Sequence, residues 1–199
     1  MRERISLKYY LIGPLIGFSV LEYEILTNKS SCVYRQDSGI IKNEISEGDI
    51  LESRVLKTKF EDDITLLAKL IWGESRGESK EIKYAIADSV INRTRKNKWW
   101  GNTLREVILK EKQYSCFNEN DVNSKKLRNP LGYERKKVWE ECLNVAKETL
   151  SEDNIDTSNG ANHYYDTSIK KPKWAKNKKP VLILKAKKGK KIKFYKLNN

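Results

Sequence analysis

The chain has 199 residues, of which 34% are charged, and its formal net charge is +13. This length is enough for one domain that buries its own core. Thirteen lysines and no acidic residue lie between Lys170 and Asn199, and the remaining 27 basic residues equal the 27 acidic ones. The positive charge therefore belongs to the tail, which argues against a nucleic-acid-binding surface spread over the fold and suits an anionic polymer or surface.

The N-terminal region begins with basic residues and continues with an uncharged run, Tyr9–Leu21. Thirteen residues match the apolar part of an export signal and fall short of the ~20 that span a bilayer. For residues 1–26 two interpretations stay open: a signal or signal anchor with transient membrane contact, or a buried helix. Residues 27–60 are polar and broken, and we predict a linker or accessory wrap with little regular structure.

A helix is predicted next, with Glu61–Asp63 in its first turn and Gly77 after its end. Its apolar residues recur with the spacing of one buried face: Ile64, Leu67, Ala68 and Ile71. Glu74 continues that face at the negative end of the helix, so burial and the helix dipole should both raise its pKa. A carboxyl kept protonated in this way is a general acid. The alternative is the last polar residue of a frayed helix.

Further elements follow in order. Ser79 caps a helix that ends near Arg95, and Thr103 begins a capping box. A longer helix is predicted over Glu134–Leu150. The segments Val181–Ala186 and Lys191–Leu197 predict a β-hairpin. The pattern is that of a mainly helical α+β domain over residues 61–199.

One histidine and three cysteines without CxxC spacing predict no metal site.

Four blocks of sequence resemble the SleB-type cell wall hydrolases, which include spore cortex-lytic enzymes. They are Leu70–Glu78 with Ala85–Arg93, then Lys112–Phe117, Gly160–Tyr165 and Pro172–Ala175. The resemblance spans roughly Ile64 to Tyr195. It departs from the family at Ile192, where a histidine is typical.

The resemblance implies a lysozyme-like helical fold, a peptidoglycan substrate, no cofactor and action in the cell envelope, either after export or tethered by the N-terminus. Glu74 corresponds to the catalytic acid. The substrate-binding residues that it implies are Gln113, Tyr114, Ser115, Asn162, His163 and Tyr164. We expect a monomer whose tail, Lys170–Lys196, contacts anionic wall polymer, and no nucleic-acid partner.

No second carboxylate stands at motif spacing. Glu78 is the candidate second acid, and four others qualify by residue type alone: Asp88, Glu119, Asp121 and Asp166. A site with one carboxylate fits a lytic transglycosylase that cleaves the MurNAc–GlcNAc bond, with the sugar 6-hydroxyl closing a 1,6-anhydro ring. The alternatives are a lysozyme-type muramidase that uses water, and a non-enzymatic polyanion-binding protein that acts through its lysine-rich tail.

Overall fold

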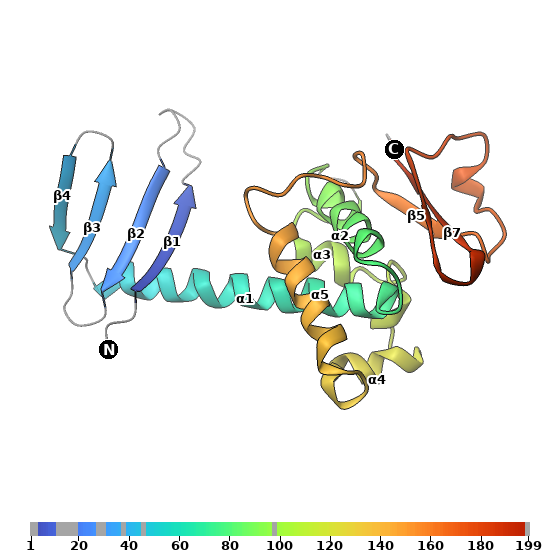
Figure 1. Cartoon of the computed structure of the whole chain (residues 1–199), viewed down its shortest axis with the longest axis horizontal. Coiled ribbons are helices and arrows are strands. Elements are labelled where there is room, and N and C mark those ends of the chain that lie inside the picture. Colours follow the sequence, from blue (N-terminus) through green and yellow to red (C-terminus); the bar gives the residue numbers. More distant parts are fainter. Residues whose placement is uncertain are drawn as a thin grey trace. The chain divides into compact units, whose positions relative to one another are not determined.

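The computed structural model describes residues 4–10, 20–26, 31–36, 39–44, 47–96 and 99–197. The chain divides into two compact units, residues 1–58 and 59–199. The division falls inside α1 (Glu47–Ser75), a helix of 29 residues (Figure 1). Residues 59–199 hold every candidate site residue named above.

The first unit contains a four-stranded antiparallel sheet with the strand order β1-β2-β3-β4 (Figure 1). Its strands are β1 (Arg4–Tyr10), β2 (Val20–Leu26), β3 (Ser31–Gln36) and β4 (Gly39–Glu44). The prediction of little regular structure over 27–60 is therefore wrong, and so is the buried helix at the N-terminus. In β1, Ile5, Leu7 and Tyr9 alternate with polar residues, which is the period of a strand.

Most of the apolar run Tyr9–Leu21 lies outside the described residues, and its two ends belong to β1 and β2. The export signal or anchor therefore stays a prediction. None of the helices in the described ranges has both the length and the apolar character needed to cross a bilayer.

Helix α1 begins far earlier than predicted, at Glu47. The predicted first turn, Glu61–Asp63, lies in the middle of the helix, because half of the residues from 47 to 60 are good helix formers and none of them is proline. The helix ends at Ser75, one residue after Glu74, as the apolar pattern indicates.

Four shorter helices and four 3-10 turns complete the helical part of the second unit. The helices are α2 (Lys80–Thr94), α3 (Leu104–Leu109), α4 (Val122–Arg128) and α5 (Lys136–Thr149). The turns are η1 (Ser115–Phe117), η2 (Pro130–Gly132), η3 (Lys173–Ala175) and η4 (Lys187–Gly189). Both predicted caps are confirmed: the Ser79 side chain accepts from the Ile82 amide, and Thr103 with Glu106 forms a capping box.

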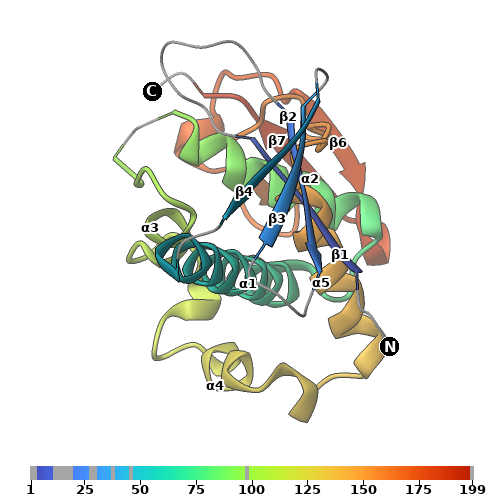
Figure 2. The ribbon, with the colours of Figure 1, turned by 90° about the vertical axis from the view of Figure 1, so that its left-hand side faces the viewer.

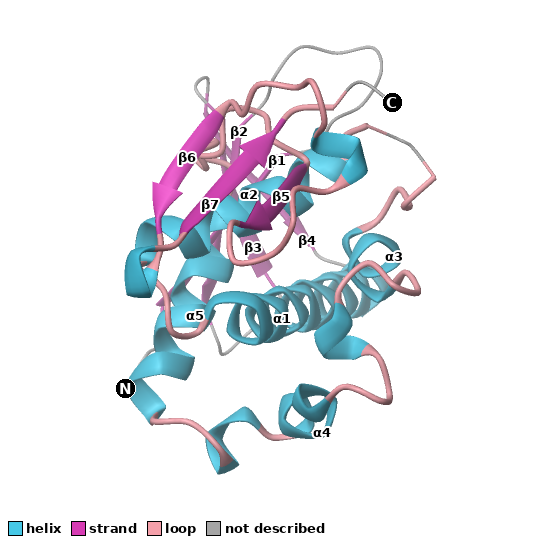
Figure 3. Cartoon of the chain, turned by 90° about the vertical axis from the view of Figure 1, so that its right-hand side faces the viewer, coloured by secondary structure: helices cyan, strands magenta, loops and turns pink. Residues whose placement is uncertain are grey.

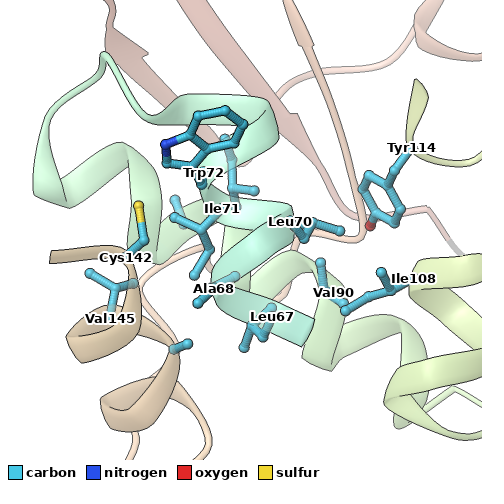
Figure 4. Close-up of a cluster of buried hydrophobic side chains, with 14 of the residues drawn as sticks. Leu67, Ala68, Leu70, Ile71, Trp72, Val90, Ile108, Tyr114, Cys142 and Val145 are labelled. Atoms are coloured by element: carbon cyan, nitrogen blue, oxygen red, sulfur yellow. The ribbon is translucent and has the colours of Figure 1, made fainter. Parts of the chain in front are cut away.

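The core surrounds the C-terminal half of α1. Figure 4 shows apolar side chains of α1 between Cys142 and Val145 of α5 on one side and Val90, Ile108 and Tyr114 on the other. The fully buried α1 side chains in this core are Leu67, Ala68, Leu70, Ile71 and Trp72. The predicted buried face of this helix is therefore confirmed and is wider than the pattern indicates.

A three-stranded antiparallel sheet follows, in the order β5-β7-β6 (Figure 3). Its strands are β5 (His163–Asp166), β6 (Leu182–Lys185) and β7 (Lys191–Tyr195). The hairpin of β6 and β7 confirms the prediction. Strand β5 was not predicted, because four residues are too short to show a clear alternation. The second unit is mainly helical with a small sheet, as predicted.

The faces of this sheet differ. Tyr164, Phe194 and Leu182 are paired across the three strands, and they belong to the main core. The other face carries Tyr165 and Tyr195, which pack with Trp174 in a second cluster. Within the second unit, the C-terminal half of α1 runs between α4 on one side and α2 with this sheet on the other (Figures 2 and 3).

Candidate active site

The carboxylate of Glu74 lies in the last turn of α1 and is half-buried. The Tyr164 hydroxyl donates a hydrogen bond to Glu74 Oε2 at 3.0 Å. Burial is the largest cause of the raised pKa of Glu74, while hydrogen bonds from Tyr164 and the Cys116 thiol lower that pKa. The charge of Asp121 also raises the pKa of Glu74, and the charge of Arg93 lowers it. The net effect favours the protonated acid.

Cys116 reaches Glu74 because Gly73 leaves room for it. A Cβ atom on Gly73 would lie 2.6 Å from the Cys116 Sγ, so a larger residue would displace η1. Burial raises the pKa of the Cys116 thiol, and the charge of Glu74 raises it further. The thiol therefore stays protonated and serves as a hydrogen-bond donor to the carboxylate.

Arg93, in the last turn of α2, joins three segments around the same acid. Its Nε donates to the Asn162 carbonyl at 2.7 Å, and its Nη1 donates to the Tyr114 hydroxyl at 2.9 Å and to Gln113 Oε1 at 3.3 Å. Burial raises the pKa of Tyr114 to about 12. Arg93 is itself buried, so these hydrogen bonds hold a desolvated cation close to Glu74.

Asn162 is fully buried, and its side chain forms hydrogen bonds with the backbone of Leu197. Its Nδ2 donates to the Leu197 carbonyl at 2.8 Å, and its Oδ1 accepts from the Leu197 amide at 2.9 Å. Both polar atoms of the side chain are thus used inside the protein. The structure places Asn162 as the residue that fixes the start of β5 to the segment after β7.

His163 lies on the opposite face of β5 from Tyr164. Its ring packs against Trp100 and Trp174, with ring centroids 5.8 and 5.1 Å away, and its Nδ1 is 2.9 Å from Asn162 Oδ1. Burial, followed by the charge of Arg93, lowers the pKa of His163 to about 4. This histidine is neutral at neutral pH and belongs to an aromatic row.

Comparison with known proteins identifies the family of the chain. The family model described as Cell Wall Hydrolase matches residues 77–190, more than half of the chain. The chain belongs to the cell wall hydrolase family. No curated protein and no solved structure matches it. The matched range contains Arg93, Cys116 and Tyr164, and it begins three residues after Glu74.

Membership in the cell wall hydrolase family confirms the SleB-type resemblance and supports enzymatic action on peptidoglycan in the cell envelope. Of the predicted site residues of this hydrolase, the structure gathers Glu74, Tyr164, Tyr114 and Gln113 around Arg93. Ser115 is exposed at the start of η1.

Glu78 does not join the cluster in this hydrolase. Its Oε2 accepts a hydrogen bond from the Lys187 amide at 2.9 Å, so the carboxylate ties the end of α1 to the turn of the hairpin. Glu78 lies four residues after Glu74, beyond the end of the helix, and its side chain follows the loop instead of the buried face.

The other candidate acids have different surroundings. Asp88 is buried and accepts hydrogen bonds from both the amide and the hydroxyl of Thr157. Asp166 accepts from the Ser168 amide, and Glu119 is exposed. Asp121 caps α4, and its charge contributes to the raised pKa of Glu74. Of these four acids, Asp121 is the one whose charge acts on the pKa of Glu74.

Sequence reasoning missed two residues of the cluster, Arg93 and Cys116. Both lie inside the blocks that resemble the family, and Cys116 directly follows the predicted residue Ser115. Within the described ranges, no group of three or more His, Cys, Asp or Glu side chains is placed to hold a metal ion. The absence of a cofactor stays a prediction.

Proposed function

We propose that this cell wall hydrolase cleaves the MurNAc–GlcNAc glycosidic bond of peptidoglycan as a lytic transglycosylase, with Glu74 as its acid and base. The observation that carries the proposal is the half-buried Glu74 carboxyl, whose pKa is raised by burial and whose Oε2 is held by Tyr164. A protonated, oriented carboxyl is what protonation of a glycosidic oxygen requires.

In the proposed reaction the Glu74 proton passes to the leaving glycosidic oxygen. The bond between that oxygen and the muramic C1 breaks, and its electron pair goes to the protonated oxygen. The 6-hydroxyl oxygen of the same muramic residue then bonds to C1, and its proton returns to the Glu74 carboxylate. The products are a free hydroxyl on one sugar and a 1,6-anhydro ring on the other, so atoms and charge balance without water.

The neighbours of Glu74 have distinct proposed roles. Tyr164 and Cys116 orient the carboxyl and limit the rise of its pKa, because both donate hydrogen bonds to it. The positive charge of Arg93 favours the carboxylate that forms after proton donation. Gln113 is half-buried and Ser115 is exposed, and both polar side chains lie beside this cluster. This position suits contacts to sugar hydroxyl or N-acetyl groups.

A muramidase that uses water is the second candidate, and the position of Asp121 favours it. Asp121 is an acid that acts electrostatically on Glu74, so it is the residue that would orient water or stabilise the sugar cation. A non-enzymatic polyanion-binding protein is less well supported, because the chain belongs to a hydrolase family.

The decisive experiment digests purified cell walls and analyses the fragments by mass. We expect 1,6-anhydro-muramic ends from the wild-type protein, and a loss of lysis by about 10²-fold or more in Glu74→Gln, the contribution of a general acid. Asp121→Asn serves as the comparison and should retain most activity.

Reducing muramic ends as the sole products, together with inactive Asp121→Asn, would replace the transglycosylase with the muramidase. Full activity of Glu74→Gln in wall digestion would remove Glu74 from its proposed role altogether.

A further inference from the structure

A pocket of about 790 Å³ lies between α1, α3, η1 and α4, and its lining does not include Glu74. This volume is large enough for part of a ligand to lie in the pocket without being enclosed by it. The pocket is open and contains both charged and apolar side chains. Neither the family match nor the proposed acid chemistry gives this pocket a function.

The pocket adjoins the proposed active site through one face of α1. Its α1 residues, Asp62, Thr65, Leu66 and Lys69, have the spacing of one helix face. Gly73 is the next position on that face, and Cys116 packs on it. Cys116 lines the pocket and also hydrogen-bonds to the Glu74 carboxylate. A ligand in the pocket is thus one side chain away from the acid.

The charges around the pocket favour an anion. Four cationic side chains line it, from α1, α3 and α4: Lys69, Arg105, Lys125 and Arg128. Two acids, Asp62 and Glu119, oppose them, so the lining has a positive excess. Lys69 is half-buried, which strengthens its attraction for an anion compared with a fully solvated lysine.

The pocket also has an apolar component. Leu66, Phe117 and the buried Leu127 line it, on three different elements. A ligand that matches both components carries carboxylates and short apolar groups together. A muramic residue without its stem carries a single lactyl carboxylate close to the sugar ring, whereas a stem extends further carboxylates and short apolar side chains away from the ring.

We propose that this pocket binds the carboxylate-bearing peptide stem of peptidoglycan, next to the glycosidic bond that reaches Glu74. The inference rests on the proposed function, because the stem is attached to the muramic acid beside that bond. Cys116 is the common neighbour of the pocket and of Glu74, so the stem and the glycosidic bond would lie on the two sides of this side chain. The substrate class is therefore a peptide-bearing glycan, in preference to a peptide-free one.

The test compares two soluble fragments in a binding titration: a GlcNAc–MurNAc disaccharide with its peptide stem, and the same disaccharide whose lactyl carboxyl is a simple amide in place of the stem. Glu74→Gln is the background, so that neither fragment is cut during the measurement. We expect tighter binding of the peptide-bearing fragment. Adding Lys69→Gln and Arg105→Gln should weaken its binding about fivefold, as for the loss of two partly solvated charge pairs, and leave the other fragment unaffected.

Two further variants control for charge and for space. Lys136→Gln with Lys137→Gln removes the same charge from the exposed start of α5, outside the pocket, and should leave both affinities unchanged. Thr65→Trp fills the pocket from an exposed position and should weaken only the peptide-bearing fragment.

Equal affinity of the two fragments, or equal loss in the pocket and control variants, would overturn the inference. The inference would also be overturned if a polyglycerol phosphate of matched charge bound as tightly as the peptide-bearing fragment and if the pocket variants lowered its affinity by the same factor. Wall digestion by the wild-type protein separates this failure from that of the proposed function. If the protein digests walls but does not prefer the peptide-bearing fragment, only the stem-binding role of the pocket is refuted. If the protein does not digest walls, the proposed function and the inference that rests on it are both refuted.

Discussion

The Glu74 carboxylate receives its hydrogen bond from Tyr164, a residue 90 positions further along the chain. Its second donor, Cys116, is on a different element again. Burial raises the pKa of Glu74 while these donors lower it, so the protonation state depends on a balance between opposing causes. Changing one donor should therefore move the pH range in which the proposed acid works.

We predict that Tyr164→Phe lowers the rate of wall digestion about tenfold, the loss of one hydrogen bond to a charged group. The hydrogen bond favours the ionised form, so its removal raises the pKa of Glu74 further. Activity that requires the protonated acid is lost as pH rises through this pKa, and the alkaline limb of the pH profile should move to higher pH.

Tyr165→Phe is the matched control, because it removes a hydroxyl from the next residue on the opposite face of β5. Its hydroxyl is bonded to Tyr195 and not to the candidate site. A shift of the profile to lower pH in Tyr164→Phe, or an equal shift in both variants, would contradict the assigned role of Tyr164.

At the scale of elements, β5 separates two environments. Tyr164 enters the main core and reaches Glu74, whereas His163 joins the aromatic row with Trp100 and Trp174. The low pKa of His163, about 4, arises from burial and from the nearby charges of Arg93, Lys178 and Lys96. The fold thus favours the neutral ring and disfavours the imidazolium.

This lowered pKa predicts a pH dependence of stability. The pKa of His163 rises to its ordinary value of 6.5 on unfolding, so its stabilising contribution is present above pH 6.5 and is lost as pH falls towards 4. His163→Phe keeps an aromatic ring and cannot titrate. We expect it to be less stable than wild type at pH 7, by about 1 kcal/mol for the lost hydrogen bond to Asn162.

The measurement is urea unfolding of both proteins at pH 7, 5.5 and 4.5. The free energy of unfolding should decrease less towards acid pH in His163→Phe than in the wild-type protein. Parallel curves for the two proteins would show that His163 does not titrate with a lowered pKa in the folded state.

At the scale of the whole molecule, six of the thirteen lysines of the basic tail lie on the C-terminal hairpin. Lys185 and Lys191 are paired across β6 and β7 on the face of the sheet turned away from the main core, and Lys193 shares that face. The turn between the strands adds the exposed lysines Lys187, Lys188 and Lys190. These side chains form a cationic surface that we propose contacts anionic wall polymer.

We predict that replacing five hairpin lysines with glutamine weakens binding to intact walls and spares cleavage of short soluble fragments. The substituted residues are Lys185, Lys187, Lys188, Lys190 and Lys191. Exposed charges are screened beyond ~8 Å at physiological salt, so wall binding by the unmodified protein should also weaken steeply as salt rises. Pull-down of the protein with purified walls over a salt series measures both effects.

The control removes the same charge from exposed lysines outside the tail: Lys59, Lys112, Lys136, Lys137 and Lys147. Equal weakening by the two sets would reduce the effect to net charge alone. Loss of activity on soluble fragments in the hairpin variant would mean that the hairpin shapes the candidate site. Wall binding that does not change with salt concentration would refute the electrostatic contact.

Much of the second unit could be predicted from local patterns. The buried face of α1, the caps at Ser79 and Thr103 and the C-terminal hairpin all follow from features within a few residues of each other. The same helix period places Glu74 towards the interior, and the resemblance to SleB-type hydrolases agrees with the family match. These features are local because helix periodicity, capping and turn geometry are set by neighbouring residues.

Tertiary structure alone decided what surrounds Glu74. Tyr164 and Cys116 reach the carboxylate because β5 and η1 pack against the end of α1, and Gly73 leaves the room that Cys116 occupies. Glu78, by contrast, turns to the Lys187 amide. Local periodicity carries no information on such contacts, since they join segments far apart in the chain and depend on how the core packs. The sequence by itself therefore determined that Glu74 lies on the buried face of a helix, near its end. Only the packing of distant segments decided which hydrogen bonds and charges set the pKa of Glu74.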